Sequence, residues 1–308
     1  MSRGPVRSRA RAGVARRVVA RVGLVIALAL GTIGATTASA AEPRLVFVDA
    51  REAGGRERVL TLGAMQAACP ERTVEVDDPY HERRMRYRAL PLVCVLDLGF
   101  ADSGGAAGQS GHGLLLRALD GYTRPVSGRD LISPDVFLAF GEPDPGPTGD
   151  GSPHFSPIDR RGVDPSPFYM VWTGVDRNDP HEHPWPYQLA RIEVADFAEA
   201  FPHTVPSGLD EADPGWRGYA LFRQSCASCH AINGEGGRVG PDLNVPRSIV
   251  EYRPIPQIRA YVRDPRATRY TSMPAHPGLT DADLDALIAY FRAMSERKHD
   301  PHGGGSAS

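Results

Sequence analysis

The sequence contains few cysteines and lacks the motifs of nucleotide and acyl-transfer chemistry. There are four cysteines among 308 residues. No G-x-S-x-G, Walker or dinucleotide-binding pattern occurs, so those reactions have no support. After the first 40 residues there is no basic cluster with interleaved aromatic residues, and we therefore expect no nucleic-acid partner. No internal repeat is present.

Long apolar runs are also missing, apart from one near the N-terminus. This run extends from Val22 to about Ile33, follows seven arginines within residues 1–21, and precedes Ala38-Ser39-Ala40. A basic stretch, a short apolar run and a small-residue cleavage site predict a secretory signal peptide over residues 1–40. The run is short for a membrane anchor, although an uncleaved signal anchor is the alternative. We expect a periplasmic protein with no stable membrane span after cleavage.

Two of the four cysteines lie in the stretch Cys226-Ala227-Ser228-Cys229-His230. The pattern C-x-x-C-H is the attachment signature of a c-type haem. Each thiol can form a thioether with one haem vinyl group, and His230 then becomes an axial ligand of the iron. The alternatives are a zinc half-site and a dithiol redox pair. No second ligand pair follows at short spacing, as a zinc site would require.

The flanks of this stretch favour the haem interpretation. A helix is expected to begin at Pro214, with Asp213 as its N-cap. A final amphipathic helix is expected from about Asp281 to Met294, because apolar residues recur there at helical spacing. The segments Gly240-Pro241-Asp242-Leu243-Asn244 and Ser272-Met273-Pro274 lie between them. In this order, the motifs resemble a class I cytochrome c across roughly residues 213–298.

This resemblance implies an all-α domain that carries one covalent haem c through Cys226 and Cys229. In the family, a glycine of the first helix lets an aromatic residue of the last helix approach closely. Gly218 holds the glycine position here, and Tyr290 or Phe291 holds the aromatic one.

The resemblance also implies the remaining residues around the haem iron. Pro241 would accept a hydrogen bond from the imidazole of His230, and Met273 would be the sixth ligand. Met294 and His276 are the alternatives for that position. Met294 continues the apolar stripe of the last helix, and ligation by His276 would lower the reduction potential.

The region before residue 200 predicts an α+β domain built mainly of strands. Short apolar or alternating segments predict strands near residues 45–48, 73–76, 87–92, 114–119, 122–126, 136–140, 168–172 and 189–194. Asp120-Gly121 is a hairpin turn signal. A short helix is expected to end near Ala68. Residues 103–111 are expected to form a loop, and residues 141–167 a long surface loop rich in proline, glycine and aspartate.

The order of these segments resembles the molybdopterin-binding domain of the sulfite oxidase family over about residues 57–197. The resemblance rests on these segments: Tyr87–Leu92, Leu119–Tyr122, Arg129–Leu131, Phe137–Phe140, Phe168–Gly174 and Trp185–Val194. In that family a cysteine that follows the second of these predicted strands binds molybdenum. Asp77-Asp78-Pro79-Tyr80-His81 occupies that place here, so we expect a domain without bound molybdopterin.

The two remaining cysteines leave alternatives open. Cys69 precedes the expected ligand position and Cys94 follows it. In an oxidising compartment they form either a disulfide or two buried free thiols. Molybdenum bound by Cys94 or by a carboxylate is the alternative to a domain without the cofactor.

The sequence thus predicts two domains. The expected organisation is a signal peptide at 1–40, a molybdopterin-binding-like domain at 41–205, a linker at 206–214, a cytochrome c domain at 215–298 and a disordered tail at 299–308. Residues 41–212 carry 16 basic and 27 acidic side chains, whereas residues 213–298 carry 12 and 9. This asymmetry is compatible with an acidic redox partner or with ordinary solvated surfaces.

The predicted function is single-electron transfer between periplasmic redox proteins, with the first domain as a docking module rather than an enzyme. The alternative is a molybdenum oxidoreductase similar to a sulfite dehydrogenase, with a fused haem that accepts its electrons.

Overall fold

The computed structural model describes residues 42–51, 54–144, 153–158, 162–175 and 183–301. The predicted signal peptide therefore lies outside the described residues. The described residues from Glu42 onward belong to one unit. Within it we distinguish a sheet region, residues 42–194, from a helical region, residues 195–301. Among the described residues, no helix is both long enough and apolar enough to cross a membrane.

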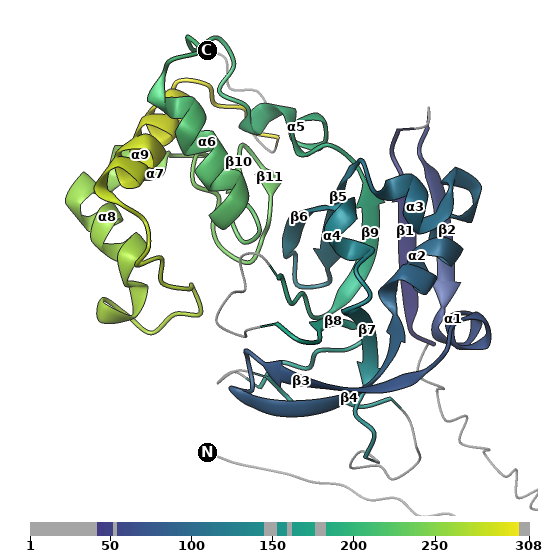
Figure 1. Cartoon of the computed structure of the whole chain (residues 1–308). Helices are drawn as coiled ribbons and strands as arrows, with labels where there is room; N and C mark the ends of the chain where they lie inside the picture. Colours follow the sequence, from purple (N-terminus) through teal and green to yellow (C-terminus); the bar gives the residue numbers. More distant parts are fainter. Residues whose placement is uncertain (1–41, 52–53, 145–152, 159–161, 176–182, 302–308) are drawn as a thin grey trace, which may run out of the picture. The chain divides into compact units, whose positions relative to one another are not determined.

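The sheet region contains a five-stranded and a four-stranded sheet (Figure 1). The strand order of the first is β2-β1-β9-β5-β6, in which only β1 and β9 are parallel. The second has the order β3-β4-β7-β8 and is antiparallel throughout. The strands are β1 (Arg44–Asp49), β2 (Arg56–Thr61), β3 (Arg72–Asp78), β4 (Arg83–Pro91), β5 (Gly113–Ala118), β6 (Thr123–Ser127), β7 (Val136–Gly141), β8 (Tyr169–Trp172) and β9 (Leu189–Val194).

The pattern of apolar and polar residues along each strand explains which of its faces are buried. On β3 the residues Val74, Val76 and Asp78 are buried and their neighbours are exposed, as expected for a strand with one face against a core. Every residue of β7 and β8 is buried, which matches their continuous apolar sequences. The predicted strands are present, and Gly121 forms the expected turn between β5 and β6 with a positive φ of 90°.

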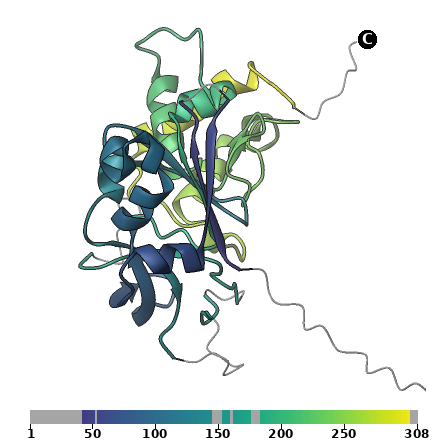
Figure 2. The same ribbon diagram turned by 90° about the vertical axis from the view of Figure 1, so that its right-hand side faces the viewer.

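Helices cover one face of the five-stranded sheet, where they appear in dark blue to teal beside the purple strands β1 and β2 (Figure 2). They are α1 (Leu62–Ala68), α2 (Leu92–Gly99), η1 (Ala101–Ser103), α3 (Gly105–Gln109) and α4 (Gly128–Leu131). Thr61 caps α1 by accepting a hydrogen bond from the Ala64 amide, and α1 ends at Ala68 as predicted. Leu92, Val95 and Leu96 of α2 are buried in the core of the region.

A disulfide joins the end of α1 to α2. Cys69 and Cys94 have their Cα atoms 5.9 Å apart and are 25 residues apart in sequence. Of the two alternatives left by the sequence, the structure therefore shows the disulfide. Neither sulfur is a thiolate, so the hypothesis that Cys94 binds molybdenum is wrong for this state of the protein.

Removal of this disulfide should destabilise the sheet region. A cross-link that closes a loop of this length restricts the unfolded chain and contributes about 3 kcal/mol. We expect the free energy of unfolding of the Cys69→Ala/Cys94→Ala double variant to be lower by about this amount. Its unfolding midpoint should therefore lie at a lower urea concentration. Reducing the wild-type protein with dithiothreitol should reproduce the loss. Equal unfolding midpoints for the oxidised wild type and the double variant would contradict this prediction.

Two loop predictions are wrong in part. Residues 103–111 contain the helix α3 and part of η1, because Gln109 is fully buried and its amide bonds to the carbonyls of Ser103 and Gly105. The segment 141–167 does not lie wholly on the surface. Phe155 is buried against Tyr87 and Tyr169, and Ile158 forms a β-bridge with Val163.

The helical region is built around two long helices, α6 and α9 (Figure 1). Its elements are α5 (Phe197–Ala200), η2 (Pro202–Thr204), α6 (Pro214–Ser225), β10 (Ala231–Ile232), β11 (Glu235–Gly236), α7 (Ile249–Tyr252), α8 (Ile255–Arg263), η3 (Pro265–Ala267) and α9 (Asp281–Ser295). Asp213 caps α6, and Thr280 with Asp283 forms a capping box that starts α9.

The contact between α6 and α9 depends on Gly218. A Cβ atom at Gly218 would lie 2.1 Å from the carbonyl oxygen of Ala286 and 2.6 Å from Cβ of Tyr290. Such distances are impossible, so only glycine permits this close approach. Of the two aromatic candidates, Tyr290 is the one in contact with the glycine. Its hydroxyl donates to the carbonyl of Thr204 at 2.7 Å.

The core of the helical region includes residues from the sheet region and its last connection. Leu115 of β5, together with Ala195, Phe197 and Phe201, belongs to the same buried cluster as Phe222 of α6. The expected domain boundary at residue 205 therefore does not coincide with a boundary in the packing. Apolar burial across this junction stabilises the contact between the two regions.

The disordered tail was predicted to begin at residue 299, but His299 makes specific contacts. The ring of His299 stacks on the ring of His203 at 3.7 Å, and its amide donates to Asn233. These contacts order the start of the segment. Residues 302–308 lie outside the part of the chain that the structure describes.

Candidate functional site: the C-x-x-C-H turn

The C-x-x-C-H stretch forms a tight turn directly after α6. The amides of Cys229 and His230 donate to the carbonyl oxygen of Cys226 at 3.1 and 2.9 Å. Both cysteines are free and half-buried. The turn therefore carries two unbridged thiols and an imidazole within one short segment. This is the donor set that two thioether bonds and one axial ligand require.

The imidazole of His230 is held by a backbone carbonyl. Its Nδ1 lies 2.8 Å from the carbonyl oxygen of Pro241, which is the contact that the resemblance implies. A carbonyl only accepts, so Nδ1 carries the proton and Nε2 keeps its lone pair for a metal. Burial lowers the pKa of His230, and the neutral ring is the form that binds iron.

Gly240 completes this support for the imidazole. A Cβ atom at this position would lie 2.4 Å from Cε1 of His230 and 2.7 Å from its Nδ1. The main chain thus passes directly against the ring, which fixes the ring orientation. Any larger residue would displace either the ring or the segment that carries Pro241.

Both thiols are protonated at neutral pH. Burial, followed by the charge of Cys229, raises the pKa of Cys226 to about 12. Burial, followed by Asp120, raises the pKa of Cys229 to about 11, although Arg124 acts in the opposite direction. A thiolate is the form that attacks a disulfide, so these pKa values disfavour the dithiol redox alternative. Within the described ranges, no three His, Cys, Asp or Glu residues gather as a metal site.

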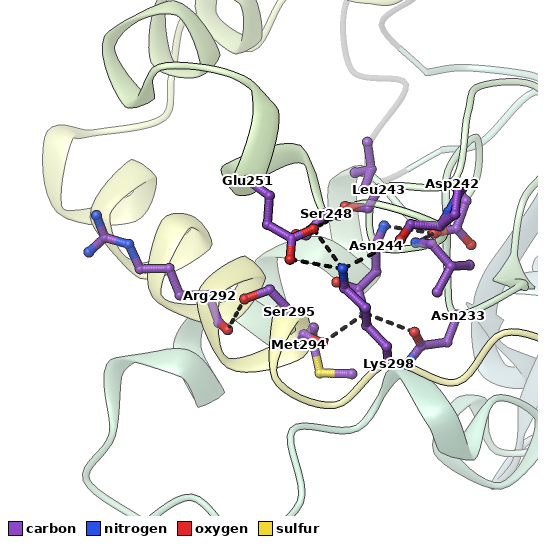
Figure 3. Close-up of polar contacts among 12 residues, drawn as sticks. Asn233, Asp242, Leu243, Asn244, Ser248, Glu251, Arg292, Met294, Ser295 and Lys298 are labelled. Carbon is purple, nitrogen blue, oxygen red and sulfur yellow. Dashed lines mark hydrogen bonds and ion pairs between the residues drawn. The ribbon is translucent and has the colours of Figure 1, made fainter. Parts of the chain in front are cut away.

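A polar network fixes the loop that follows Pro241 (Figure 3). The carboxylate of Asp242 accepts hydrogen bonds from the amides of Gly234, Asn244 and Val245 at 2.7 to 2.8 Å. The side-chain amide of Asn244 is fully buried and donates to the carbonyl oxygen of Met294 on α9 at 2.7 Å. The loop is thereby tied to the last helix, which holds the Pro241 carbonyl in place.

Ser248 and Glu251 extend this network to the C-terminal end of the region. Ser248 starts α7 in a capping box with Glu251, whose carboxylate also binds the ammonium of Lys298 at 2.6 Å. Figure 3 shows these groups beside Asn244 and Met294. The far end of the loop is therefore fixed as well.

The three candidates for the sixth iron ligand lie in different surroundings. Met273 is half-buried in the irregular segment between η3 and α9, and its amide donates to Thr271. Met294 is buried on α9 in the core of the helical region. His276 is buried, and its amide donates to the carbonyl of Val262. Ligation by Met273 stays a prediction, and its test opens the Discussion.

A buried carboxylate lies at the place where the sequence resemblance would put a molybdenum ligand. Asp78 ends β3 and is 0% exposed. Its Oδ1 accepts hydrogen bonds from the amides of Tyr80 and His81 at 2.8 and 2.9 Å. Its Oδ2 accepts the hydroxyls of Tyr87 and Tyr169 at 2.9 and 3.0 Å. Each oxygen therefore already has two donors.

The surroundings of Asp78 keep both tyrosines protonated. Burial, followed by the charge of Asp78, raises the pKa of Tyr87 and of Tyr169 well above its ordinary value. The two rings stack edge to face with centroids 5.7 Å apart. The hydroxyls act as permanent donors to the carboxylate, so a metal ion at Asp78 would have to displace them. This network has no local sequence signal, because Tyr169 is 91 residues from Asp78.

The C-terminal part of the chain, which contains this site, is similar in sequence to known proteins. Residues 216–295 match the family model described as Cytochrome c. An 86-residue segment is 33% identical to cytochrome c oxidase subunit 2 of Alkalihalophilus pseudofirmus and covers 25% of each chain. The match thus spans about a quarter of that relative's length. The C-terminal part of this protein is a cytochrome c domain, which implies haem c and a role in electron transfer.

The residues around the turn fit such a group. Two free thiols, an imidazole with its Nε2 available and a carbonyl behind the ring are all present in one place. Cys226, Cys229, His230 and Pro241 are thus brought together by the fold. Sequence reasoning missed Arg124, a buried residue of β6 whose guanidinium reaches this turn.

Proposed function

We propose that this protein is an exported monohaem c-type cytochrome that transfers single electrons between periplasmic redox proteins. The observation that carries the proposal is the turn in which two free thiols precede a histidine held by the Pro241 carbonyl. The named relative is an oxidase subunit, which supports a role in electron transfer for a domain of this kind. The sheet region would act as a docking module.

Each residue of the site has a defined part in this proposal. Haem c, when bound, supplies an iron that accepts or releases one electron at a time. Cys226 and Cys229 would hold it covalently, and His230 would bind the iron through Nε2. The Pro241 carbonyl orients the imidazole and raises its basicity. Met273 would bind the opposite side of the iron through its thioether, which favours the ferrous state.

Covalent attachment is the direct test. We expect the purified holoprotein to retain one haem after denaturation and acid–organic extraction, with iron at about one atom per chain. The Cys226→Ala/Cys229→Ala variant should lose all covalent haem, whereas the Cys69→Ala/Cys94→Ala variant should retain it. Free extraction of the haem from the wild type would refute the proposal.

The alternative function is a molybdenum oxidoreductase with a fused haem, and two observations in the sheet region speak against it. Cys94 is part of a disulfide, and the carboxylate of Asp78 is saturated by four donors. A buried carboxylate with these partners is a poor replacement for the soft thiolate that this chemistry uses. We therefore propose that the sheet region holds no molybdopterin.

Metal analysis distinguishes the two functions. In a host that makes the cofactor, we expect molybdenum far below stoichiometric amounts, and we expect no reduction of the haem when sulfite is added. Dithionite should reduce the same sample completely, which controls for a competent haem. Near-stoichiometric molybdenum together with reduction by sulfite would instead establish the enzyme.

A further inference from the structure

The hairpin turn between β5 and β6 lies directly against the C-x-x-C-H turn. The amide of Thr123 donates to the carbonyl oxygen of Ser228 at 3.0 Å, and the amide of Arg238 donates to the carbonyl oxygen of Gly121 at 2.9 Å. A Cβ atom at Gly121 would lie 2.9 Å from Cβ of Arg238. Two backbone hydrogen bonds thus connect the sheet region to the segment between the cysteines and to the loop that follows.

Arg124 extends from this hairpin toward the end of α6. Its side chain is buried, at 9% exposure. Nη1 donates to the carbonyl oxygen of Gln224 at 2.5 Å and lies 3.5 Å from Oγ of Ser228. Gln224 is in the last turn of α6, and Ser228 lies between the two cysteines. A buried positive charge therefore sits beside the attachment turn.

The location is favourable for this charge. The C-terminal end of a helix carries partial negative charge on its carbonyl groups, so a guanidinium is stabilised there. The shared apolar cluster that contains Leu115 and Phe222 also joins the two regions. The position of Arg124 relative to the turn is therefore set by the fold and does not depend on a mobile surface side chain.

We propose that Arg124 of the sheet region raises the reduction potential of the haem attached at Cys226 and Cys229. The inference rests on the proposed function. Reduction adds one electron to the iron, with no bond formed or broken, and so lowers the positive charge of the centre by one. A nearby fixed positive charge favours that reduced state. In this proposal Arg124 acts on the potential through its charge and is not a ligand of the haem iron.

This inference gives the sheet region a second role besides docking. It would set the potential of the haem from outside the cytochrome c domain. Asp120, in the same hairpin, carries the opposite charge and is exposed. Its effect on the potential should have the opposite sign and should be smaller, because solvent and salt screen an exposed charge.

The test compares midpoint potentials of holoprotein variants by redox titration. Arg124→Gln removes the charge but keeps a hydrogen-bond donor for the Gln224 carbonyl, and Arg124→Lys keeps both the charge and a donor. We expect a lower potential for Arg124→Gln and a value near the wild type for Arg124→Lys. Arg129→Gln, which removes an exposed charge from the nearby helix α4, is the matched control and should change nothing.

Each outcome decides the inference. No change in Arg124→Gln, or an equal decrease in both Arg124 variants, overturns it, because the second result would show a structural effect without a charge effect. If Arg124→Gln does not fold, Arg124→Met takes its place, because it also removes the charge from a long side chain: a potential equal to that of Arg124→Lys overturns the inference. Absence of covalent haem in the wild type would instead refute the proposed function, so the two failures are distinguishable.

Discussion

The Met273→Ala variant is expected to have a markedly lower reduction potential and to lose the weak near-infrared band that reports a sulfur–iron bond. A thioether ligand favours ferrous iron, so its removal favours the ferric state. Axial ligands change haem potentials over a span of about 0.8 V, and we expect a decrease on the order of 100 mV or more. The band is measured by absorption of the ferric protein, and the potential by redox titration.

The Met294→Ala variant is the control for this experiment. Met294 is 1% exposed in the core of the helical region, so its truncation should cost about 2–5 kcal/mol of stability. The near-infrared band should persist in this variant. Loss of the band in Met294→Ala, with its retention in Met273→Ala, would show that the ligand assignment is wrong. Absence of the band already in the wild type, with loss of the second histidine signal in His276→Ala, would point to His276.

Asp78→Ala is expected to destabilise the protein more than any other single substitution considered in the sheet region. The substitution leaves four donors without their acceptor, two of them the buried hydroxyls of Tyr87 and Tyr169. A buried donor left without an acceptor costs about 1–3 kcal/mol, so the two tyrosine hydroxyls alone account for roughly 2–6 kcal/mol. Urea unfolding followed by circular dichroism should show a loss of this size.

Asp77→Ala, at the exposed neighbouring position, is the matched control and should change stability by less than about 1 kcal/mol, because the interactions of an exposed carboxylate contribute little. Tyr87→Phe removes one donor and keeps the ring, so its effect should be intermediate. A wild-type stability for Asp78→Ala would mean that the carboxylate is not the centre of this network. Molybdenum bound by the wild type but lost from Asp78→Ala would show that Asp78 is a metal ligand.

The sequence by itself determined the features that depend on short-range order. The C-x-x-C-H turn closes through hydrogen bonds between neighbouring residues, and a cap followed by a periodic apolar stripe defines α9. Gly121 forms its turn because a hairpin of this length requires a positive φ, which glycine adopts without strain. Each of these is decided within about one turn of chain, so the local sequence contains the necessary information.

Only the tertiary structure decided which distant side chains meet. Phe155 was expected on the surface because its loop is polar, yet it packs on Tyr87 and Tyr169. The pairing of Cys69 with Cys94 depended on how α1 and α2 pack, which cysteine spacing does not specify. Arg124 reads as an ordinary strand residue until the fold brings it to Gln224, 100 residues later. Such contacts arise from the packing of whole elements, because the burial of apolar faces selects one arrangement and the polar groups inside it must then find partners there.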